Sequence, residues 1–323
     1  YLLVTWYGKM TALEIADKLK ISSESAHETA TALMGLGAFI DISETEFEAM
    51  HPRFTAVNMY RKMCEREHIE FKRNKIVDNI NRFPVSVNPD AFGRTRVSNP
   101  LTLFDSSHRY RDNNLWESLI VGTGATVGFS TTEGLVNIGI GTTAGCSAIR
   151  ETSKVFPYQP GKSLQVMNTF VMNPPKTNLR QRIGYFGADN GMYFEIDGTT
   201  AYFVEKSLST GTETRVAQED WNMDPADGTG FTGYILDKTK IQMAYMDYSW
   251  YGAGKIRYGF KDSVGHIRYF HEFRHNNKLD ESYFRSGNLP SRYEIENGPT
   301  ATTAPTLFHF GTSIIMDGTF DDD

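Results

Sequence analysis

From about residue 115 onward, apolar and polar residues alternate in short runs that are separated by turn residues. Asn190-Gly191 and Asp197-Gly198 lie between such runs, and both pairs favour type I′ hairpin turns, which need positive φ angles. A similar turn is predicted over residues 262–265. The pattern predicts ten or more strands, the clearest over residues 164–172, 180–187, 192–196, 201–205, 255–261, 267–273, 291–296 and 307–316. Because no convincing helix accompanies them, we expect a mainly β fold, a two-sheet, jelly-roll-like β-sandwich.

The first 82 residues follow a different pattern and hold only 3 of the 28 glycines and 1 of the 12 prolines. Thr11-Ala-Leu-Glu14 has the spacing of a capping box, which predicts a helix to about Lys20. A second helix is predicted to start at Ser23 and to stop at Gly37. Two short helices joined by a tight turn form a helix-turn-helix.

Two short alternating runs follow this pair of helices. Residues 39–42 and 47–50 alternate like the two strands of a wing, and a long helix is expected over residues 56–80. The sequence therefore predicts a small α-helical, winged-helix domain in front of the β-sandwich.

We place the domain boundaries at residues 82 and 114. This gives a winged-helix-like helical domain over 1–82, an extended arm or linker over 83–114 and the β-sandwich over 115–323. Pro84 and Pro89 favour extended backbone at the start of the arm. The arm has little periodicity, yet it carries apolar side chains that a free linker would not leave in water. These are Phe92, Val97, Leu101, Leu103 and Phe104.

The apolar side chains of the arm can be buried in two ways. They can pack across the chain's own sandwich, or they can lie as an extended assembly arm on a neighbouring subunit. We expect the second, so that removing residues 83–106 would abolish oligomerisation and leave a folded β core.

Composition excludes several classes of protein. The chain has 323 residues with a net charge of −6, which does not suit a protein that coats a polyanion. At 40% hydrophobic residues it is too apolar for disorder, and it has no unbroken run of 18 apolar residues that would cross a membrane. Cys64 and Cys146 lie far apart, which does not favour a disulfide framework or a zinc site.

Residues 271–275 match the HExxH signature of zinc proteases letter for letter. That signature needs a helix, because only there do two histidines four residues apart converge on one ion. The flanking residues alternate with period 2, which predicts a strand and keeps His271 and His275 apart. We therefore expect no catalytic residue, cofactor or metal, and a metalloprotease is only a formal alternative.

The segment from Thr11 to Arg53 resembles archaeal winged-helix transcription regulators of the TrmB type. In DNA-binding members of this fold, the second helix offers Arg, Lys, Asn or Gln to the major groove. Here that helix contains no Lys or Arg, and residues 1–50 hold 3 basic and 8 acidic residues. Because this charge repels phosphate, we do not expect specific binding to duplex DNA.

A second resemblance covers residues 85–316. Four motifs in order are similar to a domain found in structural proteins of marine tailed bacteriophages of the cyanophage type. The motifs are NPDAFGRTRVSNPLTLFDS at 88–106, RETSKVFPYQPGKS at 150–163, MNPPKTNLRQRIGYFG at 172–187 and LPSRYEIE at 289–296. The resemblance implies a virion protein with no enzymatic role, a component of the tail, baseplate, fibre or capsid decoration. Its expected partners are copies of itself, other virion proteins and host-surface glycans.

The alternative from another class is a transcription regulator. Its winged helix would bind DNA and its β domain would sense a sugar, as the TrmB resemblance implies. The aromatic runs around Tyr193, Tyr202 and Tyr248 could supply a sugar-stacking surface, but such runs are more often core and sheet surface.

Overall fold

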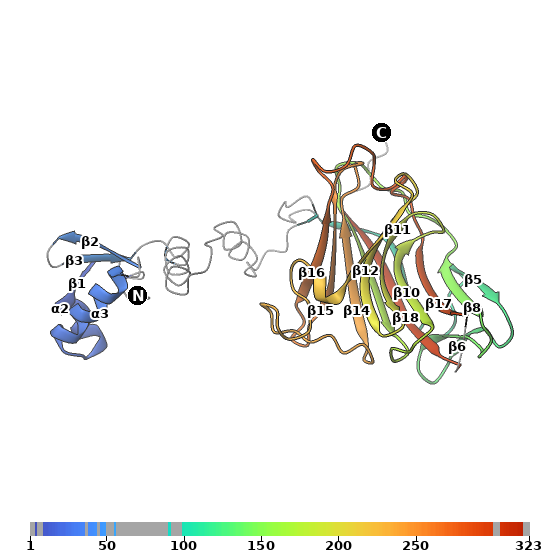
Figure 1. Cartoon of the computed structure of the whole chain (residues 1–323), viewed down its shortest axis with the longest axis horizontal. Coiled ribbons are helices and arrows are strands. Elements are labelled where there is room, and N and C mark those ends of the chain that lie inside the picture. Colours follow the sequence, from blue (N-terminus) through green and yellow to red (C-terminus); the bar gives the residue numbers. More distant parts are fainter. Residues whose placement is uncertain are drawn as a thin grey trace. The chain divides into compact units, whose positions relative to one another are not determined.

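The chain folds into two compact units, Tyr1–Val87 and Asn88–Asp323 (Figure 1). The computed structural model describes Val4, residues 9–35, 38–43 and 46–49, Thr55, and residues 90–91, 99–299 and 304–318. Within this part of the chain, no helix has the length and the apolar composition that crossing a bilayer requires.

The first unit contains the two predicted helices, α2 (Ala12–Leu19) and α3 (Ser23–Gly35). The capping box at the start of α2 is confirmed, since Thr11 Oγ1 accepts a hydrogen bond from the Glu14 amide at 3.2 Å and Glu14 Oε2 accepts one from the Thr11 amide at 2.8 Å. Ser22, one residue earlier than expected, caps α3 by accepting a bond from the Ser25 amide.

A small antiparallel sheet packs with these helices. It has the order β1 (Met10–Thr11), β3 (Glu46–Ala49) and β2 (Phe39–Ser43), so the two predicted strands of the wing are present. Its core joins Ile15 and Ala26 of the helices to Phe39 and Phe47 of the strands. The predicted long helix over 56–80 lies outside the described residues, and the winged-helix assignment therefore stays a prediction.

The second unit is a β-sandwich of two antiparallel sheets, as the alternation predicted. The first sheet has seven strands in the order β13 (Thr212–Ala217), β12 (Thr200–Ser207), β11 (Gly191–Asp197), β10 (Leu179–Phe186), β17 (Ser291–Asn297), β8 (Ser147–Thr152) and β5 (Trp116–Val121). The second has seven strands in the order β16 (Ile267–Arg274), β15 (Lys255–Lys261), β14 (Gln242–Tyr248), β9 (Leu164–Val171), β18 (Thr306–Asp317), β7 (Leu135–Gly139) and β6 (Thr126–Ser130), with β4 (Pro100–Ser107) as an eighth.

The predicted hairpins join neighbouring strands of these sheets. Gly191 ends the β10–β11 turn with a φ of 144°, a backbone conformation that glycine adopts without strain. Gly198 has a φ of 60° between β11 and β12. A single 3₁₀ turn, Gln218–Asp220, is the one helical element that the structure describes in this unit.

One strand from near the C-terminus lies in the middle of each sheet and joins its two halves. β17 lies between β10 and β8 in the first sheet. β18 pairs with β9 along one edge, and along its other edge it pairs first with β7 and then with β4. Both sheets therefore depend on pairing between segments that are distant in the sequence.

The predicted arm needs correction over residues 100–107, because this segment is the strand β4 and pairs with β18 of the same chain. Phe104 is buried in the chain's own core, and Leu101 and Leu103 are half-buried. These three residues thus take the first of the two alternatives, packing on their own sandwich. Phe92 and Val97 lie outside the described residues.

The beginning of the arm also contacts the sandwich. Ala91 and Asp90 are buried, and the Ala91 amide donates to Ser163 Oγ at 3.2 Å. Ser163 in turn donates to Asp247 Oδ1 at 2.5 Å. A deletion of residues 83–106 would accordingly remove one strand and one anchored turn from the β-sandwich.

The core lies between the two sheets and consists mainly of aromatic rings. The inward-facing residues alternate along each strand, for example Ile183 and Tyr185 on β10 opposite Met246 and Tyr248 on β14. Phe203 stacks on Trp221 and Tyr258, with ring centroids 4.1 and 4.7 Å apart. This core packs the two sheets against each other.

Candidate functional site

The HExxH sequence does not form a metal site. His271 lies on strand β16, as the alternation predicted, and His275 comes directly after the strand. His275 Nε2 is 2.6 Å from Glu205 Oε2, whereas His271 Nδ1 accepts a hydrogen bond from the Asn222 amide at 3.2 Å. The two imidazoles therefore interact with different neighbours. Within the described residues, no three His, Cys, Asp or Glu side chains gather as metal ligands would.

Most of the aromatic rings in the two runs belong to the core. Phe194, Phe203 and Tyr248 are fully buried between the sheets, whereas Tyr193 is buried in a separate small cluster with Phe186 and Val204. Among the exposed rings, Tyr251 is 67% exposed. The structure thus brings no row of exposed rings together in these two runs.

Charged side chains pair with one another on the outer face of the seven-stranded sheet, next to edge strand β13. Glu195 is fully buried there and forms ion pairs with Arg180 and Arg215. Arg180 also binds Glu213 at 2.7 Å, and Arg215 binds Asp197 at 2.7 Å. Two of these five residues, Glu213 and Arg215, lie on β13 itself. Charges on an edge strand oppose pairing with another chain, so β13 is a protected edge.

The opposite edge of the same sheet has a different character. β5 carries Leu119, Ile120 and Val121, which are 59%, 46% and 48% exposed. Among the large apolar side chains that are exposed on the described residues, these three are the ones that lie on a strand. Three adjacent exposed apolar residues on an edge strand favour contact with another protein.

The main chain of β5 is also available on that side. β5 pairs with β8 along one edge, and no described strand pairs with the other. The Leu115 carbonyl accepts a hydrogen bond from the Ser153 amide at 2.9 Å, which shows that Leu115 and every second residue after it direct their main-chain groups toward β8. Because main-chain groups of an antiparallel strand point to alternate sides, Ser118 and Ile120 direct their N–H and C=O groups to the free edge.

A buried polar cluster packs against the start of β5. His108 and His309 meet with ring centroids 4.6 Å apart, and His309 stacks on Tyr293 at 3.9 Å. The Trp116 ring of β5 lies 4.5 Å from His309 and 5.5 Å from the Arg150 guanidinium carbon. The N-terminal end of the exposed strand is thus anchored through Trp116.

The cluster leaves several of its polar atoms without partners. Neither ring nitrogen of His108 has a hydrogen-bond partner among the described residues, nor has Nδ1 of His309 or Nε of Arg150. Burial, aided by the nearby Arg150, lowers the pKa of His108 to about 4. Burial and then His108 hold the pKa of His309 well below its usual range. Both imidazoles are therefore neutral at neutral pH, and Asp112 is the carboxylate that pairs with Arg150.

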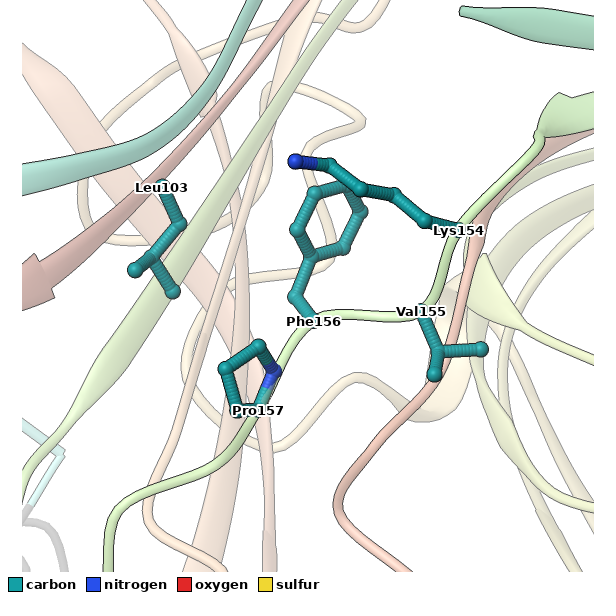
Figure 2. A pocket seen from close by; sticks show the side chains of 5 residues that line it. All are labelled: Leu103, Lys154, Val155, Phe156 and Pro157. Carbon is teal, nitrogen blue, oxygen red and sulfur yellow. The ribbon is translucent and has the colours of Figure 1, made fainter. Parts of the chain in front are cut away.

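A shallow cavity of about 230 Å³ lies between β4 and the segment that follows β8 (Figure 2). Leu103 lies on one side, and Val155, Phe156 and Pro157 line the other. The Lys154 ammonium reaches over the Phe156 ring, 5.7 Å from its centroid. With one titratable group on its lining, the cavity lacks the pairs of acids, bases or nucleophiles that a catalytic site needs.

No protein-family model matches the chain, and no curated protein is similar to it in sequence. Several solved structures are similar in outline. The carbohydrate recognition domain of Emp47p is 12% identical with a TM-score of 0.41, over 73% of this chain and 99% of that one. A protein of unknown function from Shewanella oneidensis MR-1 is 10% identical with a TM-score of 0.43, over 76% and 97%.

The binding domain of botulinum neurotoxin serotype C1 is 10% identical with a TM-score of 0.41, and the match spans 68% of this chain and 49% of that one. Because these identities and scores are low, the similarities assign neither a ligand nor an activity to this chain.

Proposed function

We propose that this chain is a non-catalytic structural protein that acts by assembling with other protein chains. The observation that carries the proposal is the contrast between the two edges of the seven-stranded sheet. β13 is covered by paired charges, whereas β5 exposes Leu119, Ile120 and Val121 beside main-chain groups with which no described strand pairs. A monomeric protein would be expected to protect both edges.

The proposed setting is the particle of a tailed phage, as a component of the tail, baseplate, fibre or capsid decoration. The four motifs of the phage resemblance support this setting. Their residues include Tyr185 and Tyr293, which are buried and contact Tyr248 and Thr312 of the opposite sheet. Such motifs preserve a fold and would not be expected to build a reactive site. Binding to host-surface glycans stays a prediction of the same resemblance.

Two finer structural assignments belong to this proposal. We infer a jelly-roll-like sandwich and a winged-helix first unit, the latter supported by α2, α3 and the β2–β3 pair in that order. α3 contains no Lys or Arg and has the acidic Glu24 in its first turn, so the first unit is proposed as a docking module that does not bind DNA specifically.

The proposal is tested on purified particles of the phage that encodes this chain. Quantitative mass spectrometry should find the chain in many copies per particle, and immunogold labelling should place it at one position on the tail or capsid. A chain that is expressed during infection but absent from purified particles would rule out a structural role.

A further inference from the structure

The exposed edge of β5 matches a second copy of itself. The strand contains one charged residue, Glu117, and the run Leu119-Ile120-Val121. Gly122 ends the strand with a φ of 87°. Glu117 to Val121 form a five-residue segment of this strand with Leu119 at its centre.

When two such segments pair antiparallel around a two-fold axis at Leu119, their main-chain groups can hydrogen-bond and their opposing side chains are compatible. Ser118 then faces Ile120 of the other copy, and both residues direct main-chain groups to the free edge. Glu117 faces Val121, so no two like charges meet. The two Leu119 side chains face each other on the outer side of the joined sheet.

We propose that two copies of this chain associate through β5, with Leu119 at the two-fold axis, so that their seven-stranded sheets become one continuous sheet. This inference rests on the proposed function, since it names the partner and the surface of the assembly. The two-fold contact is isologous and closes with two molecules. The charged edge β13 on the far side of each sheet prevents further extension.

Disulfide trapping tests the register. Directly opposed residues in a non-hydrogen-bonded antiparallel pair have Cα atoms about 4.5 Å apart, within the range of a disulfide. In a Cys64→Ser background, full-length Leu119→Cys should form covalent dimers under mild oxidation at least tenfold faster than Ile120→Cys. Thr214→Cys on the protected edge β13 is the matched control, exposed as Leu119 is, and should form no covalent dimer.

A charge variant tests the energetics independently of the cysteines. Leu119→Lys places two ammonium groups together at the axis, and sedimentation velocity should show dimerisation weakened at least 100-fold. The urea midpoint should be unchanged at concentrations low enough for the parent to be monomeric, because association itself stabilises the folded state. Thr214→Lys should change neither quantity.

The outcomes separate the two levels of the proposal. If the chain dimerises and neither Leu119 variant affects it, the β5 interface is wrong and the structural role stands. If the chain is monomeric at all concentrations but present in particles, the second copy is wrong as the partner. If it is absent from particles, the proposed function fails whatever the cross-linking shows.

Discussion

The two edges of the seven-stranded sheet differ in what stabilises them. Toward the β13 edge, Arg180 of β10 and Arg215 of β13 surround the buried carboxylate of Glu195 on β11, and the exposed edge strand is charged. At β5, the buried side is anchored by Trp116 and a neutral histidine pair, and the exposed side is apolar. The same backbone ladder thus ends in a surface that opposes pairing at one edge and in a surface that favours it at the other.

Under the proposed assembly, the charged network serves folding and the apolar strand serves association. Glu195 needs its two arginines because an unpaired buried charge is costly. Leu119 and Val121 gain little from the fold, since they remain about half exposed. Changes at the two edges should therefore affect different measurements.

The largest effect is expected at the β13 edge. Replacing both Arg180 and Arg215 by Met leaves Glu195 buried without a cationic partner, which should lower the free energy of unfolding by about 3–5 kcal/mol. Urea denaturation followed by fluorescence measures this change. Adding Glu195→Leu to the double variant should recover a large part of the loss, because the buried charge is then gone. A double variant that is as stable as the parent would show that the ion pairs contribute nothing.

An intermediate effect is expected at the β5 edge when the pH falls. Because burial and Arg150 lower the pKa of His108 from its usual 6.5 to about 4, the folded state excludes a proton that the unfolded state binds. The stabilisation is complete above about pH 6.5 and is lost as the pH falls toward 4, a loss on the order of 3 kcal/mol. The groups that face His108 are His309, Arg150 and Asp112, and Tyr293 stacks on His309.

The control for this pH effect is His108→Leu, which sacrifices no hydrogen bond because both ring nitrogens lack a partner among the described residues. Between pH 7 and pH 4.5, the unfolding free energy should fall less steeply with pH in this variant. Near pH 5, the difference in slope should correspond to close to one bound proton. The remaining slope includes His271, whose pKa burial also lowers to about 4. Parallel curves for parent and variant would contradict the assignment.

The smallest effect on stability, and a sharp change in assembly, is expected when β13 is made to resemble β5. Glu213→Val with Thr214→Ile removes the partly exposed pair between Arg180 and Glu213, which should cost no more than about 1 kcal/mol. Each molecule then has two associating edges, and light scattering should detect open-ended chains in place of dimers. Adding Leu119→Lys should return the assembly to dimers; monomers in every combination would refute the edge model.

The sequence was informative where one strand or one turn determines the outcome. Alternation located β9 to β12 and β15 to β18, Asn190-Gly191 and Gly198 marked their hairpins, and the capping box at Thr11 started α2. In these cases the deciding interactions lie within a few residues of each other.

The sequence was uninformative where distant partners decide. Three adjacent apolar residues, Leu119-Ile120-Val121, indicate a strand that is buried on both faces, and only the order of strands shows that β5 is last in its sheet. The segment 100–107 lacked a clear alternation because Pro100 and the bulge opposite Ile314–Ile315 interrupt it. His108 follows β4 as a single histidine, and nothing in the local sequence indicates that His309 packs against it.

The central positions of β17 and β18 have a consequence for synthesis of the protein. Until these two strands leave the ribosome, β5 and β8 cannot join β10, and β4 and β7 cannot join β9. At a translation rate of 5–20 residues per second, the apolar strand β5 waits on the order of 10 s for its sheet to be completed. Under the pairing proposed above, two nascent chains on one messenger RNA would expose the same apolar strand before either sandwich has closed, and the spacing of ribosomes would then affect how much correctly folded protein is made.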